Sequence, residues 1–188
     1  MAHKVLDFTH SVIAGCVREG DLVVDATVGN GHDTAFLARR VGERGHVWGF
    51  DVQEEAIRST SQRLCRLGLG DRVTLVRDTH ASVAGYVPRP VQAVVFNLGY
   101  LPGGARSVTT TAGETVAALR ASASLLAPGG RLAVVMYRGH EGGPLEAEAV
   151  LSWAESLGVS WTVVRYGFGA RRGSPPEVLI AARAHAPR

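Results

Sequence analysis

The chain has 188 residues, of which 46% are hydrophobic and 20% are charged, and this composition excludes a disordered or fibrous protein. The 20 Lys and Arg residues exceed the 17 Asp and Glu residues by only three, so net charge alone does not indicate a nucleic acid partner. No apolar run approaches the roughly 20 residues that a membrane span needs, and the N-terminus lacks the apolar stretch of a signal peptide. We expect a cytoplasmic protein in which residues 1–188 form a single domain.

Apolar runs alternate with helical periodicity along most of the chain. The predicted elements, in chain order, are a helix from Val5 to about Gly20, a strand at Leu22–Val24, a helix through Ala35–Ala38, a strand at Val47–Phe50, a helix through Ile57–Leu67, strands at Val73–Val76 and Val91–Phe96, a helix at Ala112–Ala127, a strand at Leu132–Tyr137, and a helix through Leu145–Leu157. Strands that are apolar throughout and are separated by helices predict a parallel sheet covered on both faces.

The last third of the sequence departs from this alternation. Trp161–Tyr166 and Val178–Ala182 are rich in β-forming residues, and the Gly, Arg and Pro residues between them leave no room for a helix. We expect an antiparallel hairpin at one edge of the sheet. The predicted fold class is therefore α/β, with a doubly wound, mostly parallel seven-stranded sheet and a C-terminal antiparallel hairpin. This is the Rossmann-like plan of class I methyltransferases.

Polar residues follow four of the predicted strands, namely Asp25, Asp51, Asp78 and Asn97. Aspartate and asparagine also end strands simply because they favour turns. Ligands in open α/β sheets bind outside the carboxyl ends of the strands. Four polar ends in succession, two of them followed by glycine loops, favour a ligand crevice at this edge.

The first of these loops has the pattern of a nucleoside site. Gly29 and Gly31 allow a sharp turn and a close approach of the backbone to a ligand. Asp51 lies 22 residues beyond Gly29, at the end of the next strand, where a carboxylate can accept hydrogen bonds from ribose hydroxyls. The pattern is shared by NAD and S-adenosylmethionine (SAM). A pyrophosphate tolerates acid at a helix N-terminus poorly, whereas Asp25 and Asp33 suit a cationic sulfonium, so the charges favour SAM.

The fourth strand is followed by Asn97-Leu98-Gly99-Tyr100. Its position matches the Asn-Pro-Pro-Tyr motif of amino-group methyltransferases, in which an amide and a backbone carbonyl hold the accepting nitrogen and an aromatic ring covers it. Asn97 fits the amide and Tyr100 the ring, while Leu98 and Gly99 replace the prolines. Methyl transfer to an amine mainly requires that a neutral nucleophile be positioned against the methyl group.

With these residues, the chain resembles the rRNA methylase family of small bacterial SAM-dependent methyltransferases, which is tied to tRNA 5-(aminomethyl)-2-thiouridine methylation. The segments that carry the resemblance are residues 25–34 (DATVGNGHDT), 49–53 (GFDVQ), 97–102 (NLGYLP), 109–111 (TTT) and 137–140 (YRGH). Two positions depart from the family pattern, because Ala105 replaces an aspartate and Glu141 replaces a proline.

The resemblance, together with the motifs, gives a full set of predicted site residues. It implies that SAM is bound by Asp25, Thr27, Gly29, Asn30, Gly31, Asp33, Thr34, Asp51, Gln53, Asp78, Thr79 and His80. It implies a substrate site of Leu98, Gly99, Leu101, Pro102, Thr110 and Tyr137, with Asn97, Tyr100 and His140 as catalytic residues. No metal is expected, because His80 and His140 lack ligand-like spacing and supporting thiols.

The implied substrate is a wobble uridine in a tRNA anticodon stem-loop. Arginines at positions 106, 138, 165, 171, 172 and 183 are candidates for a basic rim that contacts its phosphates. The alternatives left open are an rRNA or small-molecule amine as acceptor, or a non-catalytic RNA-binding protein that retains a cofactor fold. The opening helix either caps the sheet or meets a second subunit in a homodimer.

Overall fold

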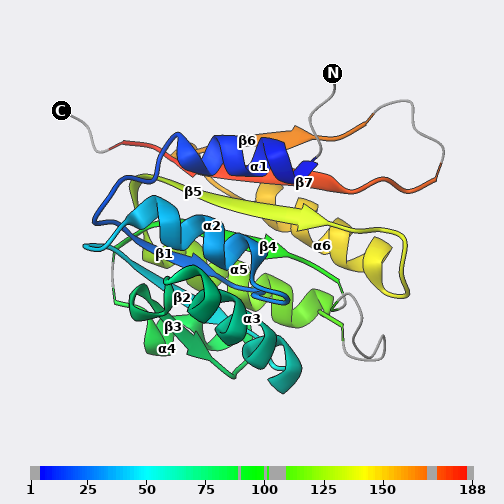
Figure 1. Ribbon diagram of the computed structural model, residues 1–188. Helices are drawn as coiled ribbons and strands as arrows, with labels where there is room; N and C mark the ends of the chain where they lie inside the picture. The colour runs from blue at the N-terminus through cyan, green and yellow to red at the C-terminus, as the bar shows by residue number, and fades with distance from the viewer. Residues whose placement is uncertain (1–4, 89, 100, 102–108, 169–172, 186–188) are drawn as a thin grey trace.

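The computed structural model describes residues 5–88, 90–99, 101, 109–168 and 173–185. Its strands form one sheet of order β3-β2-β1-β4-β5-β7-β6 (Figure 1). Their bounds are β1 Leu22–Asp25, β2 His46–Phe50, β3 Val73–Val76, β4 Val91–Asn97, β5 Leu126–Met136, β6 Trp161–Tyr166 and β7 Glu177–Arg183. Strands β1 to β5 pair in parallel, and β7 pairs antiparallel with both β5 and β6, so the predicted fold class is confirmed.

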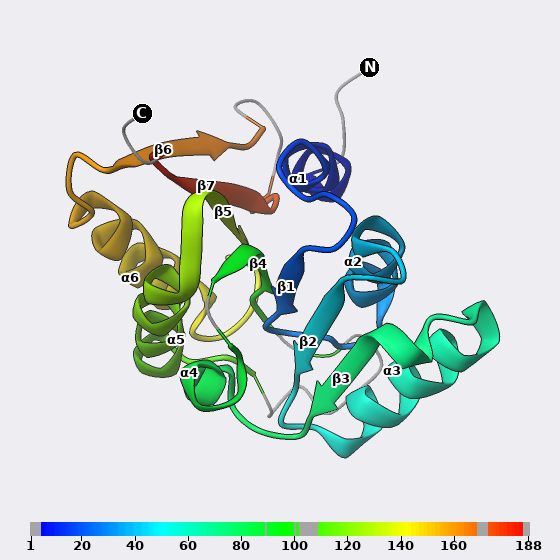
Figure 2. The same ribbon diagram turned by 90° about the vertical axis from the view of Figure 1, so that its left-hand side faces the viewer.

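Helices cover both faces of the sheet. Helices α1 (Val5–Ala14), α2 (His32–Val41) and α3 (Glu54–Leu67) lie on one side, and α4 (Val83–Tyr86), α5 (Ala112–Leu125) and α6 (Gly143–Glu155) lie on the other (Figure 2). Two short 3-10 helices occupy Gly70–Arg72 and His80–Ser82. In the part of the chain that the structure describes, no helix is both long enough and apolar enough to cross a membrane.

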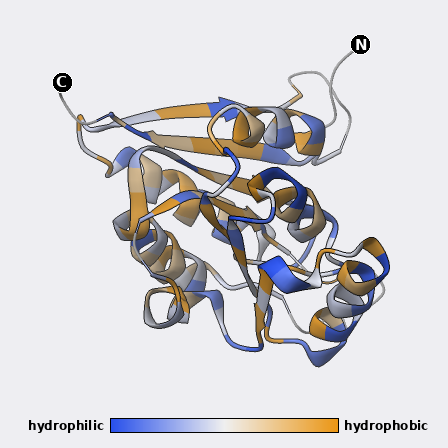
Figure 3. Cartoon of the chain, turned by 60° about the vertical axis from the view of Figure 1, so that its left-hand side comes forward, coloured by the Kyte–Doolittle hydropathy of each residue, from blue (hydrophilic) through white to orange (hydrophobic). Residues whose placement is uncertain are grey.

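The strands divide their side chains between two cores. In β4, Val94 and Phe96 are buried against the helices of the α5 face, while Ala93 and Val95 are buried on the α2 face. This alternation follows from the two-residue period of a strand. The central strands therefore bury side chains on both faces, which explains why their sequences are mostly apolar. In Figure 3 these strands are largely coloured as hydrophobic.

Three predicted boundaries were wrong. The helix expected at Ala112–Ala127 ends at Leu125, because Leu126 already pairs with Val91 of β4. Strand β5 therefore begins at Leu126 and not at the expected Leu132, and its pairing shifts in register between Val91 and Ala93 of β4. The opening helix, expected to end near Gly20, ends at Ala14. Glycine at position 15 disfavours a continued helix, and the next turn is closed by a shorter-range hydrogen bond from the Cys16 N–H to the Ile13 carbonyl.

Helix α1 caps the sheet beside the C-terminal hairpin. Val5 and Ile13 are buried in the same core as Val178 of β7. The ring of Phe8 stacks on that of Tyr166 at a centroid distance of 4.1 Å. The first helix is therefore fixed by the last two strands of the chain.

Candidate active site

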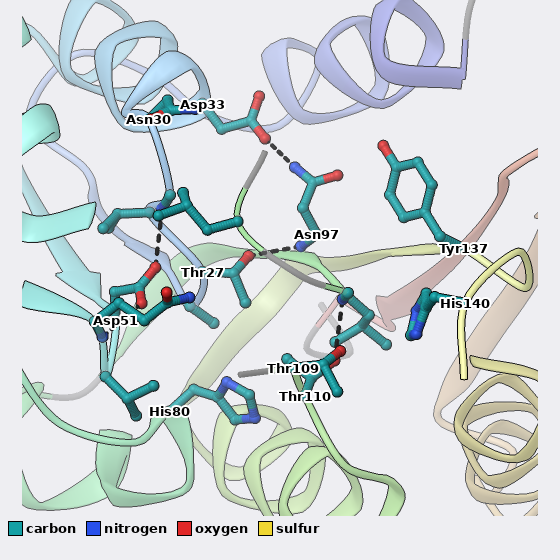
Figure 4. A pocket seen from close by; sticks show the side chains of 18 of the residues that line it. Thr27, Asn30, Asp33, Asp51, His80, Asn97, Thr109, Thr110, Tyr137 and His140 are labelled. Carbon is teal, nitrogen blue, oxygen red and sulfur yellow. Dashed lines mark hydrogen bonds between the residues drawn. The ribbon is translucent and has the colours of Figure 1, made fainter. Parts of the chain in front are cut away.

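A cavity of about 510 Å3 lies at the carboxyl edge of the parallel strands. The predicted residues that line it are Thr27, Gly29, Asn30, Asp33, Asp51, Gln53, Asp78, Thr79, His80, Asn97, Leu98, Gly99, Leu101, Thr110, Tyr137 and His140. Asp25, Gly31 and Thr34 do not line it, and Tyr100 and Pro102 lie outside the described residues. Figure 4 shows the side chains converging from the cofactor and acceptor ends.

Asp25 lies behind the cavity wall and is only 1% exposed. Its carboxylate accepts hydrogen bonds from the Thr34 hydroxyl at 2.6 Å and from the Thr27 backbone N–H at 3.2 Å. Burial, and secondly the negative charge of Asp33, raise the pKa of Asp25 to about 7. Asp25 and Thr34 thus shape the loop between β1 and α2 from inside.

Positions 29 and 31 of this loop favour glycine for different steric reasons. Gly29 has φ +48°, lines the cavity, and would place a Cβ no closer than 3.5 Å to Leu101. Gly31 has φ +76°, and a Cβ there would lie 2.8 Å from the hydroxyl oxygen of Thr60 in α3. Close packing of the loop against α3 is therefore one reason for glycine at position 31, and its contact with the ligand stays a prediction.

The end of the cavity that the sequence predicts for the nucleoside centres on Asp51. Its two carboxylate oxygens accept the backbone N–H groups of Gly29, at 3.0 Å, and Gln53, at 2.9 Å. Burial raises the pKa of Asp51, and these donors partly offset the rise. Val52, beside it, is 51% exposed and lines the cavity, which offers an apolar surface next to a fixed acceptor.

His80 forms part of the floor at the same end. Burial lowers the pKa of His80, with the charge of Glu114 and a hydrogen bond to the Ala26 backbone opposing, so the ring is neutral at pH 7. Its Nε2 atom is buried and has no hydrogen-bond partner among the described residues. The ring packs edge-on against Phe96. A neutral, fixed imidazole with an unused nitrogen is suited to a polar group of a bound ligand.

The charge of the cavity is negative. Its described lining includes the carboxylates of Asp33, Asp51, Asp78 and Glu114 and contains no Lys or Arg. A ligand with a pyrophosphate would meet these charges unfavourably, whereas a ligand with a sulfonium and an amino group would be stabilised. No group of three or more metal-ligating side chains is found among the described residues.

The end of the cavity that the sequence predicts for the methyl acceptor is built around Asn97. Its backbone N–H donates to the Thr27 hydroxyl at 2.7 Å, and its side-chain amide N–H donates to Asp33 (Figure 4). The amide oxygen is buried and has no hydrogen-bond partner among the described residues. Tyr137 lies beside it, and burial, together with the charge of Asp33, raises the pKa of this phenol. The arrangement presents one unused acceptor and one protonated phenol to a substrate.

The segment after β4 is linked through Thr110 to the buried carboxylate of Glu146. The Gly99 N–H donates to the Thr110 hydroxyl at 3.0 Å, and this hydroxyl donates to Glu146 of α6 at 2.9 Å. The second oxygen of Glu146 accepts the Thr115 hydroxyl at 2.6 Å, and Glu146 is 3% exposed. Thr110, predicted as a substrate residue, thus links the Asn97 loop to two helices.

Comparisons with known proteins identify the family of this chain. A family model described as "Putative rRNA methylase" matches residues 47–182. The chain belongs to the rRNA methylase family. The methylase is 37% identical over 191 residues to the chloroplastic tRNA (mnm(5)s(2)U34)-methyltransferase of Arabidopsis thaliana, across 96% of this chain and 70% of that protein.

Solved structures agree with this assignment. The methylase is similar to a "putative rRNA-methylase" from Clostridium thermocellum, with a TM-score of 0.95 and 43% identity over 97% of this chain and 99% of that chain. It is also similar to a "putative methyltransferase" from Streptococcus mutans in complex with SAH, with a TM-score of 0.89 and 32% identity over 97% and 99% of the two chains. The enzyme is a SAM-dependent methyltransferase, as the sequence predicted.

The cavity of the methylase fits SAM. The left-handed turn at Gly29, the two acceptors of Asp51 and the exposed Val52 suit the nucleoside, and the excess of carboxylates suits the positive charges. Bound SAM supplies an electrophilic methyl group. The individual cofactor contacts stay predictions.

The basic rim predicted for this methylase is largely paired where the structure describes it. Arg138 bonds to Glu148 at 2.7 Å and to Glu177 at 2.9 Å, and Arg165 pairs with the same Glu177. Arg183 donates to a backbone carbonyl of β5. Paired arginines offer little free charge to a phosphate. The remaining candidates, at positions 106, 171 and 172, lie outside the described residues, as does the departure at position 105.

Sequence reasoning missed several residues of the site, among them Val52 and Glu114 of the cavity lining. His10 of α1 contacts Asp33, and nothing in its local pattern relates it to a residue 23 positions away. Thr109, from the 109–111 segment, lines the cavity with a buried hydroxyl that has no partner among the described residues. Glu146 did leave a signal, because it shares a helical face with the buried Val150 and Trp153, where a carboxylate is unexpected.

Proposed function

We propose that this SAM-dependent methyltransferase transfers its methyl group to a primary amine, the 5-aminomethyl group of a 2-thiouridine at the wobble position of tRNA. The observation that carries the proposal is the amide oxygen of Asn97, a residue that lines the cavity. This oxygen is buried and has no hydrogen-bond partner among the described residues. The name of the Arabidopsis relative, a tRNA (mnm(5)s(2)U34)-methyltransferase, supports the same acceptor.

The chemistry of an amine acceptor agrees with this end of the site. A neutral amine can donate an N–H to the Asn97 oxygen and keep its lone pair free for the methyl group. An ammonium group has no such lone pair, so the amine must lose a proton before it reacts. The carboxylate of Asp33 nearby favours the approach of the positively charged form from solution.

The RNA must bring a single base to the cavity. A wobble base leaves the stack of the anticodon loop more readily than a paired base, and aromatic side chains commonly receive such bases. Tyr137, which is 36% exposed at the cavity, is the described aromatic residue in position to do so. Recognition of the anticodon stem-loop follows from this proposal.

The test is methyl transfer to defined tRNA. Wild-type enzyme and labelled SAM are incubated with tRNA that carries the 5-aminomethyl group, and with matched tRNA that lacks this group. Nucleosides are then identified by mass spectrometry. We expect label on the aminomethyl uridine alone. If label instead appears on rRNA or on a small amine while this nucleoside stays unmethylated, the acceptor assignment is wrong.

The Asn97→Ala variant serves as the site control. It removes the amide oxygen without changing the nucleoside end of the cavity, so methyl transfer to the same tRNA should fall while SAM still binds. Retention of full transfer by this variant would mean that the amine is held elsewhere.

A further inference from the structure

A chain of polar contacts runs from the first helix to the acceptor end of the cavity. His10 of α1 contacts Asp33 of α2, with 2.6 Å between Nε2 and Oδ1. The other oxygen of Asp33 accepts the side-chain N–H of Asn97, at the end of β4. Each oxygen of the Asp33 carboxylate therefore has one partner, the first from a helix that covers the sheet and the second from a strand of the sheet.

This chain determines which way the Asn97 amide points. An ionised carboxylate only accepts hydrogen bonds, so the group that faces Asp33 must be the amide nitrogen. The amide oxygen then lies on the opposite side, where it is buried, without a hydrogen-bond partner among the described residues. The backbone N–H of Asn97 is fixed separately by the Thr27 hydroxyl. Only the side-chain orientation depends on Asp33.

His10 is held firmly enough to orient Asp33. Its ring stacks on Phe36 with a centroid distance of 3.9 Å and an interplanar angle of 2°. Helix α1 is in turn fixed to α2. The Arg40 side chain of α2 donates hydrogen bonds to the carbonyl of Ala14, the last residue of α1, and to the carbonyl of Val17 in the turn that follows. The side chain of Asp33 is 12% exposed and that of His10 is 32% exposed, so the contact is partly shielded from water.

We propose that His10 is a positioning residue for the methyl acceptor: acting through Asp33, it holds the Asn97 amide with its oxygen facing the cavity. There the oxygen accepts an N–H of the incoming amine. The inference rests on the proposed amine acceptor for its catalytic consequence, but the orientation of Asn97 can be measured without any substrate.

The kinetic test uses three variants. His10→Ala removes the donor and should lower kcat for tRNA methylation about 10- to 100-fold, as expected when a reacting group is misplaced. The Kd of SAM, measured by calorimetry, should stay within about twofold, because the Asp51 end is untouched. His10→Gln keeps an N–H donor at a similar reach and should recover most of kcat. Ser11→Ala is the control, since this exposed hydroxyl bonds only to the Asp7 carbonyl within the same helix, and it should leave kcat unchanged.

A spectroscopic test is independent of the acceptor. The sequence contains two asparagines, Asn30 and Asn97, so asparagine-selective 15N labelling gives two side-chain amide signals. The Asn30→Asp variant identifies the signal of Asn97 by elimination. In His10→Ala, we expect this signal to shift and its protons to exchange faster with water, while His10→Gln and Ser11→Ala retain the wild-type signal.

The outcomes separate the two proposals. If wild-type enzyme fails to methylate the aminomethyl uridine but the Asn97 signal responds to His10→Ala, the acceptor is wrong and the positioning contact stands. An unchanged Asn97 signal in His10→Ala overturns the contact, whatever the acceptor. Equal losses in kcat and in SAM affinity would also overturn it, because His10 would then be supporting the cofactor end.

Discussion

Replacing Asp25 by asparagine should make the protein more stable above neutral pH. Asp25 is 1% exposed and has a pKa of about 7, against an ordinary value of 3.8. An asparagine resembles the protonated acid in shape and charge. The Thr34 hydroxyl, which donates to Asp25 in the wild type, can rotate and accept from the new amide instead.

The sign and size of the effect follow from the pKa. Between pH 3.8 and about 7 the folded protein holds a proton on Asp25 that the unfolded chain has released, so wild-type stability falls as the pH rises through this window. Above pH 7 the full cost of the buried charge is present. At about 1.4 kcal/mol per pKa unit, this cost is at most roughly 4 kcal/mol. Asp25→Asn removes it and should be more stable than the wild type by up to that amount at pH 8, with little difference at pH 4.

The assay is urea unfolding of both proteins at pH 4, 5, 6, 7 and 8. Asp71→Asn is the control, because it removes the same charge from an exposed position in a 3-10 helix. The difference in free energy of unfolding between wild type and Asp25→Asn should grow with pH, and that for Asp71→Asn should stay small. Parallel pH profiles for wild type and Asp25→Asn would refute the reasoning, as would a lower stability of Asp25→Asn at pH 8.

Three further predictions concern the loops and the two ends of the cavity. Gly31→Ala should lower the free energy of unfolding by more than Gly29→Ala. Both variants incur the cost of roughly 1–2 kcal/mol for a non-glycine residue in the left-handed conformation, but only alanine at position 31 also clashes with α3. Equal losses in urea unfolding would contradict this prediction. Glu146→Ala should cost about 2–4 kcal/mol in the same assay, because it leaves two hydroxyls without their acceptor, and Glu146→Gln should cost less than half as much; a loss in the glutamine variant as large as in the alanine variant would count against this role. Asp51→Ala should weaken SAM binding in calorimetry by about 10- to 100-fold, as expected for the loss of a charge-assisted hydrogen-bond acceptor. Asn97→Ala should lower kcat and leave the affinity for SAM unchanged. If both variants had the same effects, the assignment of separate cofactor and acceptor ends to the cavity would be wrong.

The sheet could be predicted because the apolar sequences of its strands indicate burial on both faces. Val91–Phe96 is apolar except for Gln92, and such a run is typical of a strand buried on both faces. The terminal hairpin could be predicted because the sequence between Tyr166 and Val178 is rich in Gly, Arg and Pro, which disfavours a helix there. The short helix at Val83–Tyr86 could not be found, since four residues give no measurable period.

The site was predictable at the ends of strands and less so elsewhere. Asp51 and Asn97 line the cavity because the carboxyl ends of parallel strands meet at one edge. Asp25 has the same position along its strand, but the following loop folds over it, and its depth depends on contacts with Thr34 that no strand pattern contains. His10 reaches the site only through the packing of α1, which is a tertiary property.

The stacking of Phe8 on Tyr166 has a consequence for how the chain is completed during synthesis. Helix α1 leaves the ribosome first, but the surface that receives it includes β7 and the ring of Tyr166, which leave last. Part of the surface that holds α1 is therefore missing until translation is nearly finished, although the contacts of α1 with α2 and β5 can form earlier. A nascent chain that stops before Trp161 has the loop between β1 and α2 but lacks the strand and the ring that complete the packing of the helix that carries His10.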